Sequence, residues 1–321
     1  MDHTTKVILI VGAVLVVLGL IVFAVVMALC HGDLSQLNTT KYITNTHTFR
    51  EAFTDISVDT NTADILFGVS DDESCKVVCK EQENLKHLVS VQNGALSIRV
   101  VDERKWYEYI GISLEHPQIT VYLPEQAYGA LTVHASTADV ALPRELGFDS
   151  MDICVSTGDV SSFASVAGNA KIETTTGNIY LEDISPEALE LSVTTGQITV
   201  SRVTCSSDVT VGVSTGTARL TEVACHSLCS TGSTGDLELT HVVAADSFDL
   251  TRSTGDIRFD RCDAAQITAK TETGQIIGSL LSEKIFIAQT STGRVNVPKT
   301  TTGGRCEVST NTGNIQITVE P

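Results

Sequence analysis

The sequence predicts an all-β protein: a parallel β-solenoid, or β-helix, built from rungs of 19–20 residues and preceded by one amino-terminal transmembrane helix. Three observations predict this fold. A turn motif recurs at a fixed interval, apolar and polar residues alternate on both sides of each motif, and a strongly apolar segment stands near the start of the chain. A period near twenty is typical of stacked repeats, each of which is too small to bury its apolar face alone.

The recurring motif has Thr-Gly at its centre and an apolar residue two positions after the glycine. Glycine suits a turn that returns at the same corner, because it adopts backbone angles that a residue with a Cβ resists. Each rung is therefore expected to contain a strand, the Thr-Gly turn, a second strand and a corner leading to the next level. The nine turn glycines, 19 or 20 residues apart, are Gly158, Gly177, Gly196, Gly216, Gly235, Gly255, Gly274, Gly293 and Gly313.

Equivalent positions of successive repeats form columns. Seven and five residues before the glycine, and two and four after it, most side chains are aliphatic or aromatic, as at Ile153 and Val160, whereas Asp152 and its equivalents are polar. Residues two apart in a strand share a face, so this alternation indicates strands with one buried face. The Thr before each glycine favours β structure and offers hydroxyl hydrogen bonds between levels. Roughly ten levels, ~4.8 Å apart, predict a rod about 45 Å long.

The amino-terminal segment Val7–Leu29 contains no charged residue. As a helix rising ~1.5 Å per residue it would reach roughly 34 Å, enough to cross a bilayer. A signal peptide cut after Ala28 and lipidation at Cys30 are alternatives, but the apolar run is longer than that of a cleaved signal. Lys6 leaves positive charge on the amino side, which predicts a cytoplasmic amino end. We expect a single-pass protein of the cell membrane with an extracellular carboxy-terminal domain.

The chain between the anchor and the regular repeats is less periodic. Residues 31–45 are polar, and short strand patterns follow, one of them after an Asn93-Gly94 turn. The predicted divisions are a cytoplasmic tip and transmembrane anchor (1–30), a stalk (31–45), an irregular β region that caps the solenoid (46–130) and the regular β-solenoid repeats (131–321).

A net charge of −18 argues against a nucleic-acid partner, which would require a basic surface. The column after the turn glycine is polar, and there Asp236 and Asp256 are acids on adjacent levels. A calcium ion would need more converging oxygens than this pair supplies. We expect these side chains to cap the turns by accepting hydrogen bonds from backbone amides. No cofactor or metal is expected.

The only arrangement that resembles a catalytic strip is Arg219, Glu238 and Arg258, which should lie on successive levels of one outer column. Alternating charges on neighbouring strands more often form a ladder of salt bridges. A catalytic role would require that these residues line a groove.

The nine cysteines show no zinc-site spacing. Cys205 and Cys225 both stand nine residues after a turn glycine, so they should lie on adjacent levels, within reach of disulfide geometry. Buried free thiols, a disulfide and a metal site remain the alternatives, and free thiols are favoured.

Residues 102–116 form a charged and aromatic insertion that includes Trp106, Tyr107 and Tyr109. These rings either fold over the end of the solenoid or contact a protein or glycan partner, because exposed aromatic side chains serve such contacts.

The anchor, the strand Ile-Thr-Val-Tyr-Leu-Pro at 119–124 and the serial Ser/Thr-Thr-Gly-Asp/Asn-Ile/Val turns resemble the bacterial DUF4097 family over residues 46–321. Its members are labelled β-strand-repeat proteins or adhesins, and the adhesin label is itself an inference. The resemblance implies a surface-exposed β-solenoid and little about activity. Ala63 and Ala138, which stand where glycine is expected, and the number of cysteines depart from the family pattern.

These observations together predict a non-enzymatic, membrane-anchored extracellular β-solenoid that acts as an adhesin-like interaction module. The alternatives are a purely structural surface spacer and, less favoured, a carbohydrate-active enzyme. The last strand pattern, Ile315–Val319, has no capping element after it. Unpaired strand edges invite pairing, so we expect either end-to-end self-association there or blunting by Glu320 and Pro321.

Overall fold

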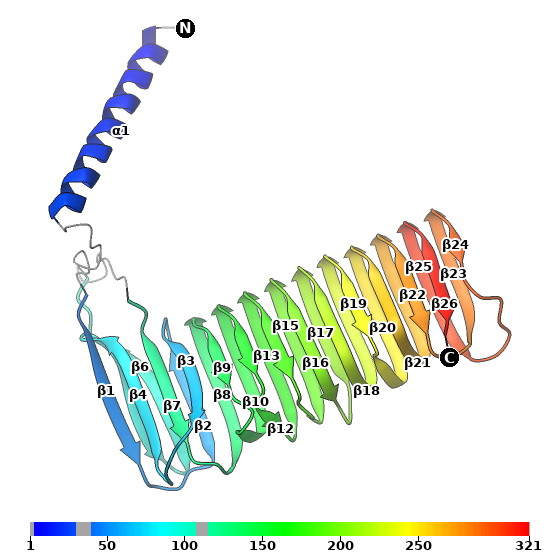
Figure 1. Cartoon of the computed structure of the whole chain (residues 1–321), viewed down its shortest axis with the longest axis horizontal. Helices are drawn as coiled ribbons and strands as arrows, with labels where there is room; N and C mark the ends of the chain where they lie inside the picture. Colours follow the sequence, from blue (N-terminus) through cyan, green and yellow to red (C-terminus); the bar gives the residue numbers. More distant parts are fainter. Residues whose placement is uncertain (1–2, 30–39, 107–114, 321) are drawn as a thin grey trace.

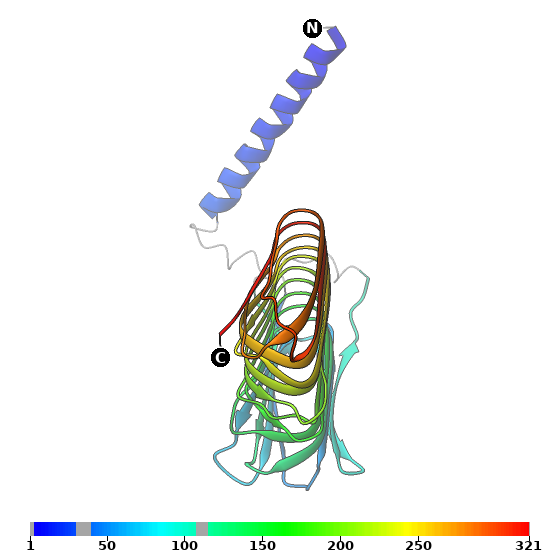
Figure 2. The same ribbon diagram turned by 90° about the vertical axis from the view of Figure 1, so that its right-hand side faces the viewer.

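The computed structural model describes residues 3–29, 40–106 and 115–320. Helix α1 (His3–Leu29) precedes a long stack of β-strands, whose far end lies well away from the helix (Figure 1). Seen along its axis, the stack is a flattened coil (Figure 2). Two β faces therefore enclose a thin interior, and the predicted solenoid is confirmed.

We call the two faces A and B. The long strands β18 (Ala218–Thr234) and β21 (Ile257–Thr273) continue through the corner and belong to both. Face A contains β3 (Asp64–Val69), β9 (Val140–Leu142), β11 (Val160–Ser162), β14 (Ile179–Glu182), β16 (Ile198–Thr204), β19 (Leu237–Thr240), β22 (Ile276–Leu280), β24 (Val295–Asn296) and β26 (Ile315–Val319). Face B contains β2 (Asp55–Thr60), β8 (Ala127–Thr137), β10 (Gly147–Thr157), β12 (Ser165–Val166), β13 (Asn169–Thr176), β15 (Ala188–Thr195), β17 (Val209–Thr215), β20 (Val243–Thr254), β23 (Lys284–Thr292) and β25 (Gly304–Thr312).

The regular rungs pair in parallel, with equivalent residues side by side. Ile153 lies between Val133 and Ile172 on face B, and Val160 lies next to Ile179 on face A. These side chains are at most 1% exposed, so the predicted columns form the core. Burial of continuous aliphatic columns is the main stabilising term of such a stack.

One rung interrupts the apolar columns with a buried charge. Arg252 is 2% exposed, and its guanidinium donates to the Ser230 hydroxyl at 2.9 Å and to the Thr251 carbonyl at 2.8 Å. Its neighbour in the preceding rung is Gly232, where a Cβ would approach the Arg252 side chain to 2.9 Å. Burial lowers the pKa of Arg252 to about 10. A glycine therefore makes room for the one large polar side chain of this column.

The Thr-Gly turn stacks on itself throughout the solenoid. All nine turn glycines have φ between +125° and +154°. A Cβ on Gly216 would lie 1.7 Å from the carbonyl oxygen of Gly196 in the neighbouring rung. Thr174, Thr271 and Thr310, three positions before a turn glycine, donate their hydroxyls to glycine carbonyls of adjacent rungs. Backbone angle and contact between rungs thus both require glycine.

The second corner of five consecutive rungs uses a residue other than glycine. Six positions after the turn glycine, the backbone adopts the left-handed conformation with φ between +52° and +59°. This conformation is uncommon for residues with a Cβ. The residues are Asp183, Arg202, Glu222, His241 and Arg261. Sequence periodicity did not single out this column.

The amino-terminal region mixes parallel and antiparallel pairing. β2 and β3 pair in parallel with regular strands, whereas β4 pairs antiparallel with both β1 and β7 and β5 pairs antiparallel with β6. β1 begins inside the segment predicted as a stalk. These strands are β1 (Tyr42–Phe49), β4 (Cys75–Gln82), β5 (Leu85–Gln92), β6 (Ala95–Asp102) and β7 (Gln118–Leu123).

The last two rungs are not stacked in chain order. β25 pairs with β21 on one side and β23 on the other, and β26 lies between β22 and β24 (Figure 1). The expectation that Ile315–Val319 is the uncapped end is therefore wrong. The end rung is formed by β23 and β24. This order is possible because rungs with the same column pattern fit against one another in either order.

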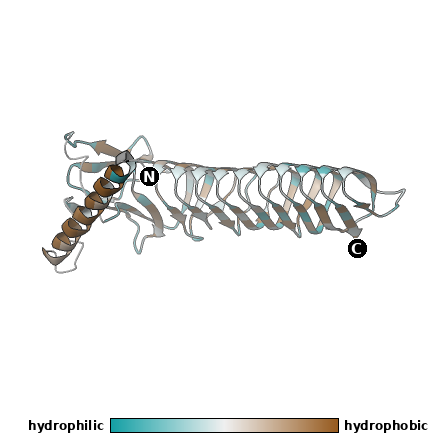
Figure 3. Cartoon of the chain, turned by 90° about the horizontal axis from the view of Figure 1, so that it is seen from above, coloured by the Kyte–Doolittle hydropathy of each residue, from teal (hydrophilic) through white to brown (hydrophobic). Residues whose placement is uncertain are grey.

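Helix α1 contributes nothing to the solenoid core. The helix is apolar along almost its whole length, as the hydropathy colouring shows (Figure 3), and none of the membrane-length segment Thr5–Leu29 is buried. The predicted apolar helix is thus present, and its length and composition fit either a membrane anchor or a signal sequence.

Candidate functional site

The charged column on face A forms a ladder of ion pairs. Arg219 contacts Glu238 at 2.7 Å, and Arg258 approaches the same carboxylate at 3.7 Å. Arg258 also binds Asp236 at 2.7 Å and Asp256 at 2.6 Å. The predicted salt-bridge ladder is confirmed, and its partly exposed pairs are of the kind that contributes little to stability.

A groove crosses face A over β19, β21, β22 and β26. Two members of the ladder, Glu238 and Arg258, line it, whereas Arg219 does not. Gly278 lies in the groove and has no side chain to fill it. The remaining polar lining is Thr240, Asp260, Gln275, Ser279, Gln316, Thr318 and Glu320. The groove therefore offers carboxylates, amides, hydroxyls and one guanidinium on a shallow surface.

The Asp and Asn residues at the turns cap backbone amides, as predicted. The Asp159 amide donates to Asp139, the Asn178 amide to Asp159 and the Gln197 amide to Asn178, at 2.7–3.0 Å. Asp256 and Gln275 continue the pattern farther along the stack. These Asp and Asn side chains therefore tie neighbouring rungs together. Since Asp236 and Asp256 both also bind Arg258, their carboxylates serve the ladder.

The predicted aromatic contact residues are only partly visible. Trp106 is 78% exposed and follows β6, at the end of the solenoid that carries the helix. Tyr107 and Tyr109 lie outside the described residues.

The cysteines of the described segments are free thiols. Cys205 and Cys225 lie near one another and are both buried, and burial raises their pKa to about 11 and about 12. Thiols with such pKa values are unreactive at neutral pH, because the thiolate is the nucleophile.

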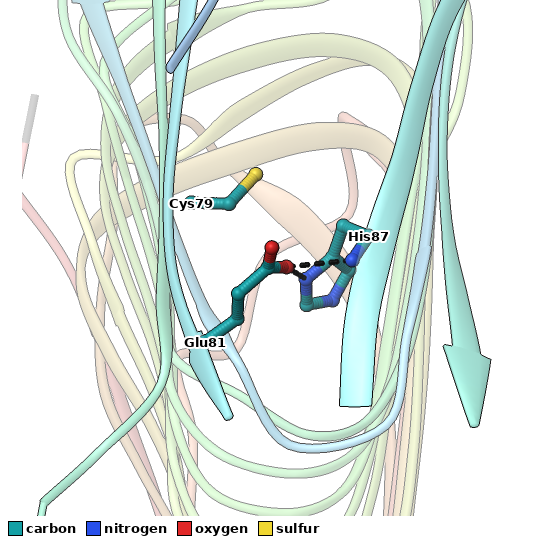
Figure 4. Close-up of side chains that lie close together, drawn as sticks. All are labelled: Cys79, Glu81 and His87. Atoms are coloured by element: carbon teal, nitrogen blue, oxygen red, sulfur yellow. Dashed lines mark hydrogen bonds and ion pairs between the residues drawn. The ribbon is translucent and has the colours of Figure 1, made fainter. Parts of the chain in front are cut away.

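A buried polar cluster near the amino-terminal end joins the two faces. Cys79 and Glu81 on β4 point across the interior toward His87 on β5 (Figure 4). Glu81 accepts from the His87 ring at 2.8 Å, from the His87 backbone at 2.6 Å and from Asn45 at 2.6 Å. The other ring nitrogen of His87 lies 2.9 Å from the Thr60 hydroxyl. Cys79, Glu81 and His87 each offer one atom that could bind a metal ion, and these three atoms lie within 4.8 Å of one another.

The contacts of this cluster fit a structural role better than a metal site. Both carboxylate oxygens of Glu81 and both ring nitrogens of His87 already have partners within the protein. Burial raises the pKa of Cys79 to about 12, and the Glu81 carboxylate contributes to this rise. Sequence analysis missed the cluster because its residues and their partners Asn45 and Thr60 come from four strands with no motif spacing. The only sequence signal is a Glu and a His among apolar strand positions.

The architecture defines a class: an all-β solenoid with a polar outer surface and an apolar helix at its amino end. The chain belongs to the DUF4097 family, whose Toastrack model matches residues 53–213 and 204–321. No curated protein matches the chain.

Several solved structures resemble the fold. A "putative lipid binding protein" from Parabacteroides distasonis has a TM-score of 0.50 and 19% identity, with 73% of this chain and 96% of that chain covered. A "putative adhesin" from Bacteroides fragilis has a TM-score of 0.42 and 14% identity, with 87% of this chain and 97% of that chain covered. At these identities the likeness concerns the fold alone.

Proposed function

We propose that the chain is a non-enzymatic, membrane-anchored module that presents its solenoid outside the bacterial cell membrane and makes adhesin-like contacts. The observation that carries this proposal is the helix, whose large apolar side chains are exposed along almost its whole length. Leaving a large apolar side chain in water instead of burying it costs about 1.5–3 kcal/mol. A bilayer would cover this surface and leave the rigid stack free to contact a partner.

Two arginines in the middle of the helix test the anchor. Val14→Arg with Leu18→Arg is expected to move the full chain from the membrane fraction to the soluble fraction, since each central arginine costs about 2.5–3.5 kcal/mol on insertion. Thr5→Arg, at the helix edge, is the control and should remain in membranes after alkaline carbonate extraction. Protease added to intact cells should digest the solenoid of the wild-type protein. A mature protein whose mass lacks residues 1–28 would show instead that the helix is a cleaved signal.

The groove on face A is the best-supported contact surface. It lies toward the end of the solenoid far from the helix, whereas Trp106 lies at the helix-bearing end. Its carboxylates Glu238, Asp260 and Glu320 outnumber the single Arg258. Such a surface disfavours anionic ligands and offers hydrogen-bond donors and acceptors for a neutral or amine-bearing glycan.

Removing two amides from the groove should weaken glycan binding. Gln275→Ala with Gln316→Ala is expected to raise the Kd for a bound cell-surface glycan at least tenfold, because two exposed hydrogen-bonding side chains are lost. Gln197→Ala with Thr199→Ala changes the equivalent columns outside the groove and serves as the matched control. A glycan array followed by calorimetry measures the effect.

The other outcomes of this experiment decide between the alternatives. Loss of binding in Trp106→Ala, with no change in the groove variant, would place the contact at Trp106. A protein that binds no glycan or surface protein would fit the structural spacer. Shortening of the glycan during incubation would support a carbohydrate-active enzyme and contradict the proposal.

A further inference from the structure

The two ends of the solenoid differ in how they cover the core. At the amino-terminal end, Leu85 and Val89 of the outer strand β5 are only 5% and 8% exposed. At the other end, Val295 of β24 is 44% exposed, although its column neighbour Ile315 is completely buried. Phe286 of the same end rung is also only partly buried. One end of the core is therefore closed and the other is open.

The open end also carries a free strand edge, β23, most of which contains no charged residue or proline. Among the described strands, β23 pairs only with β25 and β24 only with β26. Residues 285–292 of β23, Ile-Phe-Ile-Ala-Gln-Thr-Ser-Thr, contain neither a charge nor a proline. Soluble proteins normally place charged residues or proline in an edge strand, where they prevent pairing with another chain. Ile285 and Ile287 add exposed apolar surface, at 45% and 48%.

The protein itself shows what binds this strand. On its inner edge, β23 accepts β25, a strand of the same repeat type, in register from Lys284–Gly304 to Thr292–Thr312. The charge of Lys284 is compensated by Asp263 at 2.6 Å. A strand with the same column pattern thus already pairs with β23, in parallel, within one chain.

We propose that a second copy of this chain docks on the open end, with β23 antiparallel to β23 and the exposed core residues of both end rungs in contact. The asymmetry of the ends favours this two-fold arrangement, because head-to-tail stacking would place the open end against a closed one. In a two-fold dimer the free β23 edges of both copies are paired with each other, so no open end remains from which a filament could grow.

The arrangement has a consequence that rests on the proposed membrane anchor. The open end lies far from helix α1 (Figure 1). Tip-to-tip pairing would therefore place the two helices at opposite ends of the assembly. The pair could then join two facing membranes, which would make the adhesive contact homophilic.

Nanodiscs containing one full-length chain each provide the test. Electron microscopy should show pairs of discs joined by a continuous rod twice the length of one solenoid. Val295→Lys should lower the paired fraction at least tenfold, because it places a charge on the exposed core. Val243→Lys is the matched control, since Val243 is 42% exposed on β20, away from the tip. Circular dichroism and urea unfolding establish that both variants remain folded.

The proposal is overturned by single rods at all concentrations, by open filaments, or by pairs that persist in Val295→Lys. Pairs in which the two rods lie side by side would indicate association along the stack instead of at its tip and would also contradict it. Pairing can be measured in detergent by light scattering as well. Failure of the anchor would therefore leave the paired rods visible, and failure of the pairing would leave disc insertion intact.

Discussion

Gly216→Ala is expected to lower the free energy of unfolding by about 3 kcal/mol or more, the largest effect we expect from removing or adding a single methyl group. Gly216 has φ of +134°, and a non-glycine residue held in such a backbone conformation costs on the order of 1–3 kcal/mol. The added Cβ would also overlap the Gly196 carbonyl oxygen at 1.7 Å. The rungs would have to move apart, which would strain the hydrogen bond from the Gly216 amide to Thr234.

Gly212→Ala is the matched control, because it adds the same methyl group four residues earlier on β17. Its nearest contact would be the Ser192 hydroxyl at 3.7 Å, an ordinary packing distance. We expect a change within about 0.5 kcal/mol or a small stabilisation from the reduced freedom of the unfolded chain. Urea unfolding followed by circular dichroism measures both. Equal effects of the two substitutions would show that the turn stacking does not constrain the solenoid.

Glu81→Ala is expected to destabilise the protein by about 3 kcal/mol or more, because each buried donor left without its acceptor costs about 1–3 kcal/mol. Glu81 is 1% exposed, and its carboxylate accepts three hydrogen bonds from Asn45 and His87. All three donors would lose their acceptor inside the core. Glu83→Ala, two residues away and exposed, should change stability by less than about 0.5 kcal/mol. A loss below about 1 kcal/mol for Glu81→Ala would mean that water replaces the carboxylate.

Glu81 should also make the stability of the folded protein depend on pH. Burial raises the pKa of Glu81, but the hydrogen bonds from His87 and Asn45 outweigh burial and hold it below its ordinary value. A carboxylate with a lower pKa in the folded state stabilises the protein above its unfolded pKa of about 4.3, and this contribution is lost as the pH falls through the folded pKa. Below about pH 4, the wild type should therefore lose stability more steeply than Glu81→Ala. Parallel curves for the two proteins would contradict this assignment.

The candidate sites differ in how far the sequence could predict them. Arg219, Glu238 and Arg258 could be placed on adjacent levels because they share one column of a regular repeat. The groove could not be predicted, because its shape depends on Gly278 within a strand and on β26 lying beside β22. Glu81 and His87 meet across the interior of an irregular region, where no period relates one strand to another. The aromatic residues Trp106, Tyr107 and Tyr109 remain a prediction.

The sequence by itself determined the internal structure of each rung. Gly158 and its equivalents, the alternating columns and the apolar segment 7–29 specify strands, turns and one helix, because each depends on residues close together in the chain. Only the tertiary structure decided the order of the rungs. Every rung offers its neighbours the same columns, so local pattern cannot distinguish β25 beside β21 from β23 beside β21. That choice depends on the connecting loops and on contacts between distant segments, and it leaves β23, rather than the last strand of the chain, at the open end.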